Sequence, residues 1–251
     1  MIRTPLVAGN WKMHGSRAAV DDFAAQLRNS ECPATVDMLV CVPFVYLERL
    51  ALALADTVVA VGGENIAETV EPGALTGEIN GAMLADVGCR YVLVGHSERR
   101  AQQGEDDAVV ARKVNAAAAA GINPVLCVGE TLAERDSGQA ECVLARQLQA
   151  VLTACSAQTL DKLTIAYEPV WAIGSGRSAS PAQAQQMHAF IRTQIAASNV
   201  TLSRSMRLLY GGSVKPDNAA ALFAQDDVDG ALVGGASLNA ASFMDIARSM
   251  V

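Results

Sequence analysis

The chain has few positive charges, few aromatic residues and no long apolar run. Of its 251 residues, 19 are Lys or Arg and 26 are Asp or Glu, which gives a formal net charge of −7. Without a basic stripe or cluster, the sequence argues against a nucleic-acid partner and against an anionic membrane surface. No stretch approaches the roughly 18 apolar residues of a membrane span. An anionic small molecule can still bind, but the positive potential must then be local.

Paired cysteines and targeting signals are also missing. The N-terminal "MIRTPLVAGN" has no apolar core of signal-peptide length and no cleavage-like site. None of the six cysteines forms a C-x-x-C pair, so we expect free buried thiols and a cytoplasmic protein. The three histidines are dispersed, with no H-E-x-x-H or Cys/His spacing, and this argues against a metal site.

What the sequence does contain is a series of eight short apolar runs. They are "PLVAGN", "DMLVCVP", "TVVAVGG", "RYVLVG", "INPVLCVG", "DKLTIAYEP", "MRLLYGG" and "DGALVGG". Each run is almost continuously apolar rather than alternating, which is typical of parallel strands covered on both faces. Because aromatic residues make up only 4% of the chain, the core must be mainly aliphatic.

Helical patterns lie between these runs. In "RAAVDDFAAQLR", residues 17–28, apolar residues recur at the spacing of one helix face: Val20, Phe23, Ala24 and Leu27. A later segment repeats the pattern with Leu144, Leu148, Val151 and Leu152. Ser180 to Gln183, "SPAQ", predicts a helix start with a capping box and proline at the first helical position.

The alternation predicts an α/β fold, a (β/α)8 barrel formed as one domain by residues 1–251. Strands that alternate with helices give parallel βαβ units, and eight repeats fit closure into a barrel. A doubly wound open sheet is the alternative, but "VAGNWKMHG" after the first run is not the expected G-x-G-x-x-G. No linker or low-complexity tract divides the chain.

Polar residues and glycines follow the predicted strands, where the loops of a barrel converge on one mouth. In chain order they are Asn10, Lys12, Glu64, Asn65, His96, Ser97, Glu98, Glu130, Glu168, Gly211, Gly212, Ser213, Gly234 and Gly235. The glycine pairs follow the last two strands, where barrels often bind phosphate through backbone N–H groups. Such amides and one lysine can hold a phosphate on an acidic protein.

Lys12, His96 and Glu168 each have an ordinary and a functional interpretation. Lys12 is either a surface lysine or the local charge for an anionic substrate. His96 precedes a predicted short helix, whose N-terminus disfavours imidazolium, so a neutral histidine could donate to a carbonyl oxygen and accept a proton back. Glu168 ends a strand before Pro169, either in a charged turn or as a base under a movable lid. His14 and His188 are interpreted as surface or structural residues.

Seven segments together resemble the triosephosphate isomerase family over essentially the whole chain. They are "AGNWKM", "TGEI", "GHSERR", "CVGE", "AYEPVWAIGSG", "YGGSVKPDNA" and "DGALVGGASL", in the family's order and at compatible spacing. The resemblance implies interconversion of dihydroxyacetone phosphate and D-glyceraldehyde 3-phosphate, a small phosphorylated three-carbon substrate, without a metal or an organic cofactor.

The resemblance also implies roles for individual residues. Glu168 matches the base, His96 the neutral electrophile and proton shuttle, and Lys12 the cation that faces the developing enediolate. Asn10 matches a polar contact beside Lys12, and Glu98 the family's second carboxylate. Backbone N–H groups of four residues match the phosphate site: Gly174, Ser213, Gly234 and Gly235.

Two loops resemble mobile and interfacial parts of the family. Residues 169–179 match the lid, whose members include Pro169, Val170, Trp171, Ala172, Ile173, Gly174, Ser175 and Gly176, with Glu130 as the open-state partner of Trp171. Residues 62–80 resemble the long third loop that inserts into a neighbouring subunit. The resemblance therefore implies a homodimer with Thr76, Gly77 and Glu78 at its interface, and Thr76 near the partner's Lys12 region.

A few positions depart from the commonest family pattern, namely His14, Ser175, Arg177 and Ser178. None of them is a proton-transfer group, so they bear on lid kinetics and hinge rigidity. Two other functions stay open at this point: another phosphate-binding barrel enzyme, such as a sugar-phosphate epimerase, and a non-catalytic scaffold on a retained barrel. The combination of Lys12, His96 and Glu168 favours the isomerase over both.

Overall fold

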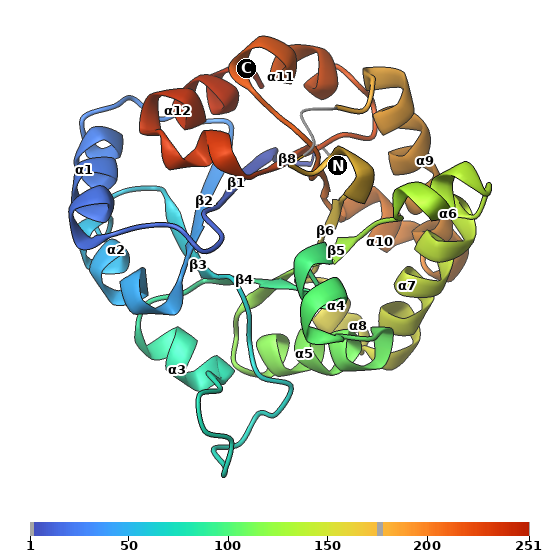
Figure 1. Cartoon of the computed structure of the whole chain (residues 1–251), viewed down its shortest axis with the longest axis horizontal. Helices are drawn as coiled ribbons and strands as arrows, with labels where there is room; N and C mark the ends of the chain where they lie inside the picture. Colours follow the sequence, from blue (N-terminus) through green and yellow to red (C-terminus); the bar gives the residue numbers. More distant parts are fainter. Residues whose placement is uncertain (1–2, 175–177, 251) are drawn as a thin grey trace.

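The computed structural model describes residues 3–174 and 178–250. Eight parallel strands form a closed barrel in the order β1 to β8, and β1 pairs with both β2 and β8 (Figure 1). The strands are β1 Leu6–Asn10, β2 Asp37–Val42, β3 Ala60–Gly63, β4 Tyr91–Val94, β5 Asn123–Val128, β6 Thr164–Tyr167, β7 Leu208–Tyr210 and β8 Gly230–Val233. Each lies within one of the eight apolar runs, so the predicted (β/α)8 barrel is confirmed.

The helices surround the barrel as an outer ring (Figure 1). The α-helices are α1 Arg17–Arg28, α2 Leu47–Ala53, α3 Gly81–Asp86, α4 Ser97–Gln103, α5 Asp107–Ala119, α6 Leu132–Asp136, α7 Ala140–Ala154, α8 Ala157–Leu160, α9 Pro181–Ser198, α10 Val200–Ser205, α11 Pro216–Phe223 and α12 Ala240–Arg248. Three short 3-10 helices complete the described elements: η1 Phe44–Tyr46, η2 Val170–Ala172 and η3 Gly235–Leu238.

The core has two layers because successive residues of a strand point to opposite faces. The barrel interior is filled by small and medium side chains: Leu6, Ala8, Leu39, Cys41, Ala60, Leu93, Val125, Cys127, Ala166, Leu209 and Leu232. A larger cluster lies between the strands and the helices, and the predicted face of α1, from Val20 to Leu27, is buried there. Both faces of each strand are thus covered, which explains the continuous apolar runs.

Helix caps define where several helices begin. The Ser180 hydroxyl accepts from the Gln183 N–H and the Gln183 side chain accepts from the Ser180 N–H, with Pro181 at the first helical position of α9. This confirms the predicted capping box. The reciprocal hydrogen bonds satisfy two N–H groups that would otherwise lack partners at the helix start.

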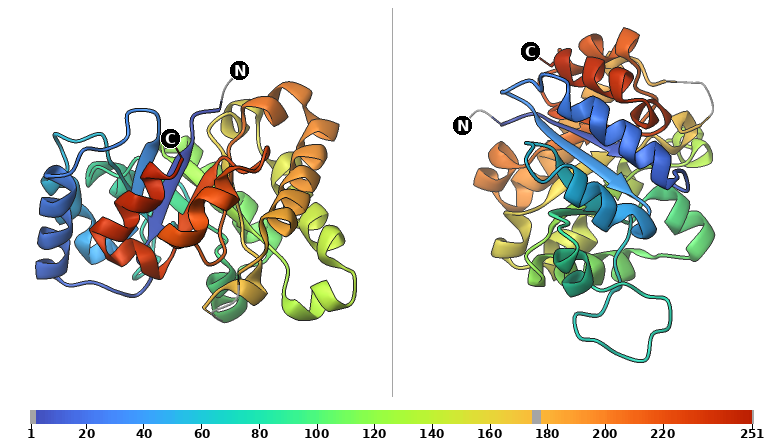
Figure 2. Two further views of the ribbon diagram at one scale, coloured as in Figure 1. Left: turned by 90° about the horizontal axis from the view of Figure 1, so that it is seen from above. Right: turned by 90° about the vertical axis from the view of Figure 1, so that its left-hand side faces the viewer.

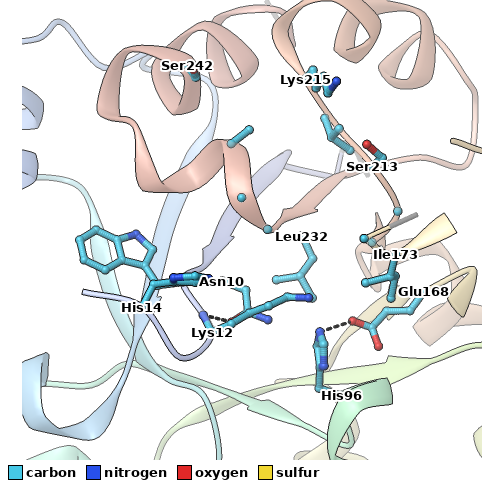
Figure 3. Close-up of a pocket in the computed structure, with 18 of the residues that line it drawn as sticks. Asn10, Lys12, His14, His96, Glu168, Ile173, Ser213, Lys215, Leu232 and Ser242 are labelled. Carbon is cyan, nitrogen blue, oxygen red and sulfur yellow. Dashed lines mark hydrogen bonds and ion pairs between the residues drawn. The ribbon is translucent and has the colours of Figure 1, made fainter. Parts of the chain in front are cut away.

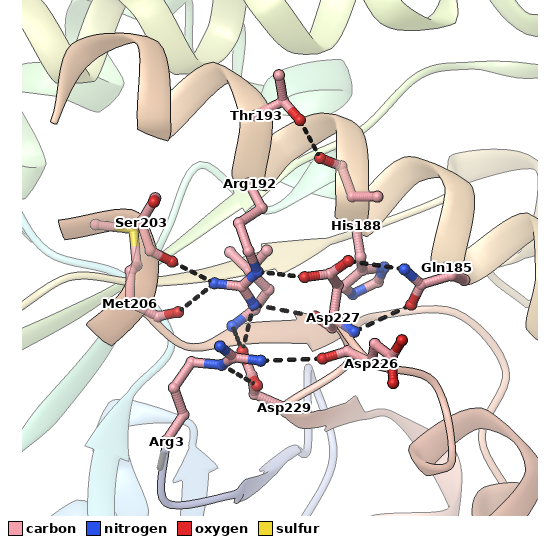
Figure 4. A network of polar contacts seen from close by, with 12 residues as sticks. Arg3, Gln185, His188, Arg192, Thr193, Ser203, Met206, Asp226, Asp227 and Asp229 are labelled. Atoms are coloured by element: carbon pink, nitrogen blue, oxygen red, sulfur yellow. Dashed lines mark hydrogen bonds and ion pairs between the residues drawn. The ribbon is translucent and has the colours of Figure 1, made fainter. Parts of the chain in front are cut away.

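A polar network stabilises the barrel end opposite to the predicted active site (Figure 4). Arg192 of α9 donates to the carboxylates of Asp227 and Asp229 in the turn before β8. Asp229 also accepts from Arg3 and from the backbone N–H of Leu208, at the start of β7. These charge-assisted hydrogen bonds fasten α9, β7 and β8 together at the amino ends of the strands.

One segment projects from the barrel. The loop between β3 and α3 extends beyond the other elements in two views (Figures 1 and 2). A backbone hydrogen bond from Ala67 N to Ile79 O, 2.8 Å long, closes its base. Every residue from Glu68 to Glu78 is exposed, including the two large apolar side chains Val70 and Leu75. An exposed excursion of this length in a compact fold tends to have a function.

The cysteines agree with the predicted free buried thiols only in part, because Cys142 is exposed and Cys32 and Cys155 are half-buried. All six cysteines are free, and three of them are buried. Among residues 3–174 and 178–250, no group of three or more His, Cys, Asp or Glu side chains is arranged to hold a metal ion. A helix of sufficient length and hydropathy to cross a membrane is likewise not found in this part of the chain.

Candidate active site

A cleft of about 690 Å³ opens at the carboxyl ends of the strands (Figure 3). Eight of the residues predicted for the site line it: Asn10, Lys12, His96, Glu168, Gly174, Ser213, Gly234 and Gly235. These residues come from five different strand ends, which a closed barrel brings to one mouth. Glu98 lines a neighbouring groove of about 270 Å³ that shares Asn10, Lys12 and His96 with the cleft.

Glu168 directly follows β6 and is almost fully buried, with 2% exposure. Its Oε1 lies 2.8 Å from His96 Nε2, and its Oε2 accepts from Ser97 N–H at 2.9 Å. Burial raises the pKa of Glu168, but the opposing effects of His96 and Ser97 prevail and hold this pKa below its usual value. In this arrangement Glu168 is an ionised carboxylate with both oxygens hydrogen-bonded.

His96 is the N-cap of α4 and is also buried, with 5% exposure. Its Nδ1 accepts from Glu98 N–H at 3.2 Å, so the ring proton lies on Nε2, which donates to Glu168. An N–H donor facing Nδ1 suits a neutral imidazole, the form expected from the sequence at this helix N-terminus. Burial lowers the pKa of His96, yet the facing Glu168 carboxylate raises it above the ordinary value. The rise in the pKa of His96 comes from its pairing with Glu168, which the sequence alone did not reveal.

Lys12 adopts a left-handed backbone conformation, with φ of 55°, unlike any other non-glycine residue in the described ranges. Its N–H donates to Asn10 Oδ1 at 3.0 Å, and its ammonium group lies 2.5 Å from Glu98 Oε1. A non-glycine residue in this region is strained by about 1–3 kcal/mol, and such residues are concentrated at functional sites. Asn10 therefore supports the turn that directs Lys12 toward the cleft (Figure 3).

Glycines keep the opposite side of the cleft open. A Cβ atom at Gly235 would meet nothing within 4 Å, and one at Gly234 would meet only Lys12 Cε, at 3.7 Å. An anion can therefore approach the backbone N–H groups there. A Cβ at Gly211 would come within 2.9 Å of Glu168 Cγ. Gly211 thus leaves the space in which the carboxylate lies.

The described part of the predicted lid begins with Pro169 and the 3-10 turn η2. Trp171 Nε1 donates to Glu130 Oε1 at 2.9 Å, so the predicted Trp171–Glu130 contact is present. Beyond the gap in the described residues, Ala179 N–H donates to Tyr210 Oη at 3.0 Å. Ser175, Gly176 and Arg177 lie outside the described residues, and Gly174, just before them, is exposed with φ of 66°.

The cleft also contains residues that the sequence reasoning did not assign to it. Leu232 lines it near Glu168, and His14, Lys215 and Ser242 lie at its edge (Figure 3). Leu232 could have been found, because it lies two residues before the glycine pair and an inward position on the last strand must face the mouth. No pattern in the sequence placed His14 in the cleft, and from the sequence alone it is interpreted as a surface residue.

The residues predicted for a dimer interface do not line the cleft. Thr76, Gly77 and Glu78 are exposed in the projecting loop. The groove beside Lys12 is lined by Met13 and Phe44, and Met13 is 95% exposed. Glu64 lies in the same groove, and its Oε1 has no hydrogen-bond partner within the described ranges. A groove lined by both polar and apolar side chains and an exposed loop are thus both present on one chain.

Comparisons with known proteins agree with this geometry. A family model described as triosephosphate isomerase matches residues 5–250. The chain is 54% identical over 247 residues to a triosephosphate isomerase of Alkalilimnicola ehrlichii, covering 98% of each protein. It is 52% identical over 248 residues to that of Pseudomonas paraeruginosa and 52% over 250 residues to that of Thiobacillus denitrificans, covering 99% of each chain in both cases.

Proposed function

The chain belongs to the triosephosphate isomerase family, and we propose that it interconverts dihydroxyacetone phosphate and D-glyceraldehyde 3-phosphate with Glu168 as the base. The observation that carries this proposal is the 2.8 Å contact between His96 Nε2 and Glu168 Oε1 inside a cleft that also contains Lys12. A base, a neutral proton donor and a cation are the groups that proton transfer next to a carbonyl requires.

The proposed reaction transfers one proton between two carbons. Glu168 takes a proton from C1 of dihydroxyacetone phosphate, and the electrons of the C–H bond move into an enediolate. His96 transfers its Nε2 proton to the oxygen on C2. The deprotonated Nε2 then takes the proton of the hydroxyl on C1. Glu168 then returns its proton to C2, which gives the aldehyde. Lys12 and Asn10 stabilise the negative charge on the oxygens.

Glu98 acts in this proposal through its neighbours. Its carboxylate pairs with the Lys12 ammonium group, and its backbone N–H donates to His96 Nδ1. The first contact positions the cation, and the second keeps the imidazole neutral with its proton on Nε2. Both contacts hold Lys12 and His96 in the positions from which they would polarise the substrate oxygens.

The phosphate group is proposed to lie against the backbone N–H groups of Gly174, Ser213, Gly234 and Gly235. All four residues line the cleft, and the glycines carry no side chain that would keep an oxygen away. Residues 169–179 are proposed to close over the bound substrate. Closure excludes water and hinders loss of phosphate from the enediolate. The exposure of Gly174 and the contact between Trp171 and Glu130 support an open lid in this proposal.

We further propose that the protein is a cytoplasmic homodimer. Six free thiols suit a reducing compartment. The exposed loop of residues 68–78 would enter the partner's groove beside Met13 and Phe44, with Thr76, Gly77 and Glu78 at the contact. In that arrangement Thr76 would approach the partner's Lys12 region, so that assembly supports catalysis.

The test is a coupled assay of triose phosphate interconversion with Glu168→Gln. The amide keeps the shape of the carboxylate but cannot accept the carbon-bound proton, so activity should fall at least 1,000-fold, by about 4 kcal/mol at 1.4 kcal/mol per tenfold change. Binding of phosphoglycolate, a planar enediolate mimic, should persist. Glu141→Gln, in the exposed first turn of α7, is the matched control. Near-normal turnover by Glu168→Gln would contradict the assignment of the base.

A further inference from the structure

The carboxylate of Glu130 lies where the start of the lid meets α6. Its side chain has no exposed surface, and three donors share its Oε1: Arg135 Nη1 at 3.0 Å, Tyr167 Oη at 3.1 Å and Trp171 Nε1 at 2.9 Å. Its Oε2 has no partner among the described residues. Arg135 and Tyr167 belong to α6 and β6, whereas Trp171 belongs to the lid. The Glu130 carboxylate therefore has two partners in the barrel and one in the lid, and the Glu130 carbonyl accepts from Val170 N–H of the lid as well.

Arg135 contacts the lid as well as Glu130. Its guanidinium carbon lies 4.9 Å from the centroid of the Trp171 ring. A cation over an indole face is attracted by the ring quadrupole, and more strongly where water is excluded. The Arg135 side chain is 23% exposed, so solvent screens this contact only in part. One side chain thus holds the buried carboxylate and covers the tryptophan that shares it.

The position of Arg135 does not depend on the lid. The capping box of α6, in which Thr131 and Glu134 exchange hydrogen bonds, fixes the turn that carries it. Its ion pair with Glu130 joins two groups outside residues 169–179. When Trp171 moves, that ion pair can stay, but the contact between guanidinium and indole is lost. A contact made in only one of two conformations shifts the equilibrium between them.

We propose that Arg135 is a positioning residue that favours the open lid by covering Trp171. The inference deepens the function proposed above and rests on it, because it takes residues 169–179 to be a lid that closes over substrate. Arg135 does not line the cleft, so it would act on ligand binding without touching the ligand.

The expected effect has a defined direction. Removing the guanidinium breaks its ion pair with Glu130 in both conformations, but it breaks the contact with the indole only in the open one, so the open, unliganded enzyme loses more. Arg135→Gln should therefore bind phosphoglycolate about three- to sixfold more tightly, which corresponds to about 0.7–1.1 kcal/mol. The KM should fall by a similar factor. The kcat should not rise, and it should fall by up to the same factor where opening of the lid limits product release.

A double-mutant cycle separates this role from a general structural one. In a Trp171→Leu background no aromatic face lies under the guanidinium, so the same Arg135→Gln change should alter phosphoglycolate affinity less than twofold. Arg135→Lys keeps the charge beside Glu130 but not the planar guanidinium, and should give a smaller shift than Arg135→Gln. Arg49→Gln breaks the exposed pair with Asp21, far from the lid, and serves as the control that leaves the affinity unchanged.

The affinities are measured by calorimetry with phosphoglycolate on the full-length protein, together with kcat and KM. Unchanged or weaker binding in a folded Arg135→Gln variant would overturn the inference. An equal shift with and without Trp171 would overturn it too. If Arg135→Gln does not fold, Arg135→Lys is placed in the same cycle and judged by the same two criteria. A wild-type chain without isomerase activity would instead refute the proposed function, which keeps the two failures distinct.

Discussion

Replacing Glu64 with Gln should stabilise the protein, and the gain should grow with pH. Glu64 follows β3 in the groove beside Lys12, and its Oε1 has no hydrogen-bond partner within the described residues. Burial raises the pKa of Glu64 to about 8, with Glu98 adding to the rise and Lys12 and His96 opposing it. The folded protein therefore holds this carboxyl protonated at neutral pH, whereas the unfolded chain ionises it.

The magnitude follows from the difference between the two pKa values. Below pH 4.5 the carboxyl is protonated in both states and costs nothing. Between pH 4.5 and about 8 the folded state binds more protons than the unfolded state, so the free energy of unfolding falls as pH rises. At about 1.4 kcal/mol per pH unit the loss reaches about 3 kcal/mol at pH 7. Since water reaches the half-buried side chain, the effective loss is about 1–3 kcal/mol.

Glutamine resembles the protonated carboxyl in shape and has no charge to lose, so Glu64→Gln removes the pH-dependent cost. A change of 1 kcal/mol shifts Tm by about 2–4 °C in a chain of this size. We expect the variant to melt several degrees above the wild type at pH 8 and within about 2 °C of it at pH 5. The measurement is calorimetric unfolding at several pH values and one protein concentration, because association would make Tm concentration-dependent.

The matched control is Glu31→Gln, an exposed glutamate outside the groove. Its Tm difference from the wild type should not grow with pH. The reasoning about Glu64 would be refuted by a Tm difference that stays constant between pH 5 and pH 8, or that decreases. Either result would mean that Glu64 is ionised in the folded protein at neutral pH.

Two further predictions concern the loops. Deleting residues 172–175, of which Ser175 lies outside the described residues, should raise phosphate elimination relative to isomerisation, because the enediolate would lose its cover; product analysis giving an unchanged ratio would mean that the loop does not protect it. Deleting residues 69–76 removes most of the exposed loop beyond Glu68, and should give a monomer with little activity. Sedimentation that finds an intact, active dimer would contradict the proposed interface.

The parts of the fold that depend on local pattern were predictable. Each of the eight strands lies within an apolar run, because burial on both faces leaves a continuous signal in the sequence. The Ser180 capping box and the buried face of α1 follow from spacing alone. The positions of Lys12, His96 and Glu168 followed from the convergence of strand ends, together with the resemblance to a family.

Three features of the site had no signal in the sequence. The left-handed backbone of Lys12 is stabilised by its own loop, in which Asn10 accepts from its N–H, and no residue type at these positions signals it. The protonated state of Glu64 depends on how much water the folded chain removes. The pairing of His96 with Glu168 joins residues from β4 and β6, and it changes the pKa of both.

In the reaction proposed above, the pairing of His96 with Glu168 determines which contacts the substrate must displace. As long as Glu168 accepts from His96 and Ser97, its lowered pKa makes it a weak base, and His96 has no free proton to offer a carbonyl. A substrate oxygen that takes the Nε2–H removes one of these partners, and a turn of the carboxylate toward carbon removes the other. Burial, the largest single influence on Glu168, then acts without opposition and raises its pKa. In the proposed mechanism, the resting contacts thus keep Glu168 ionised and weakly basic without substrate, and the substrate itself strengthens the base by displacing them.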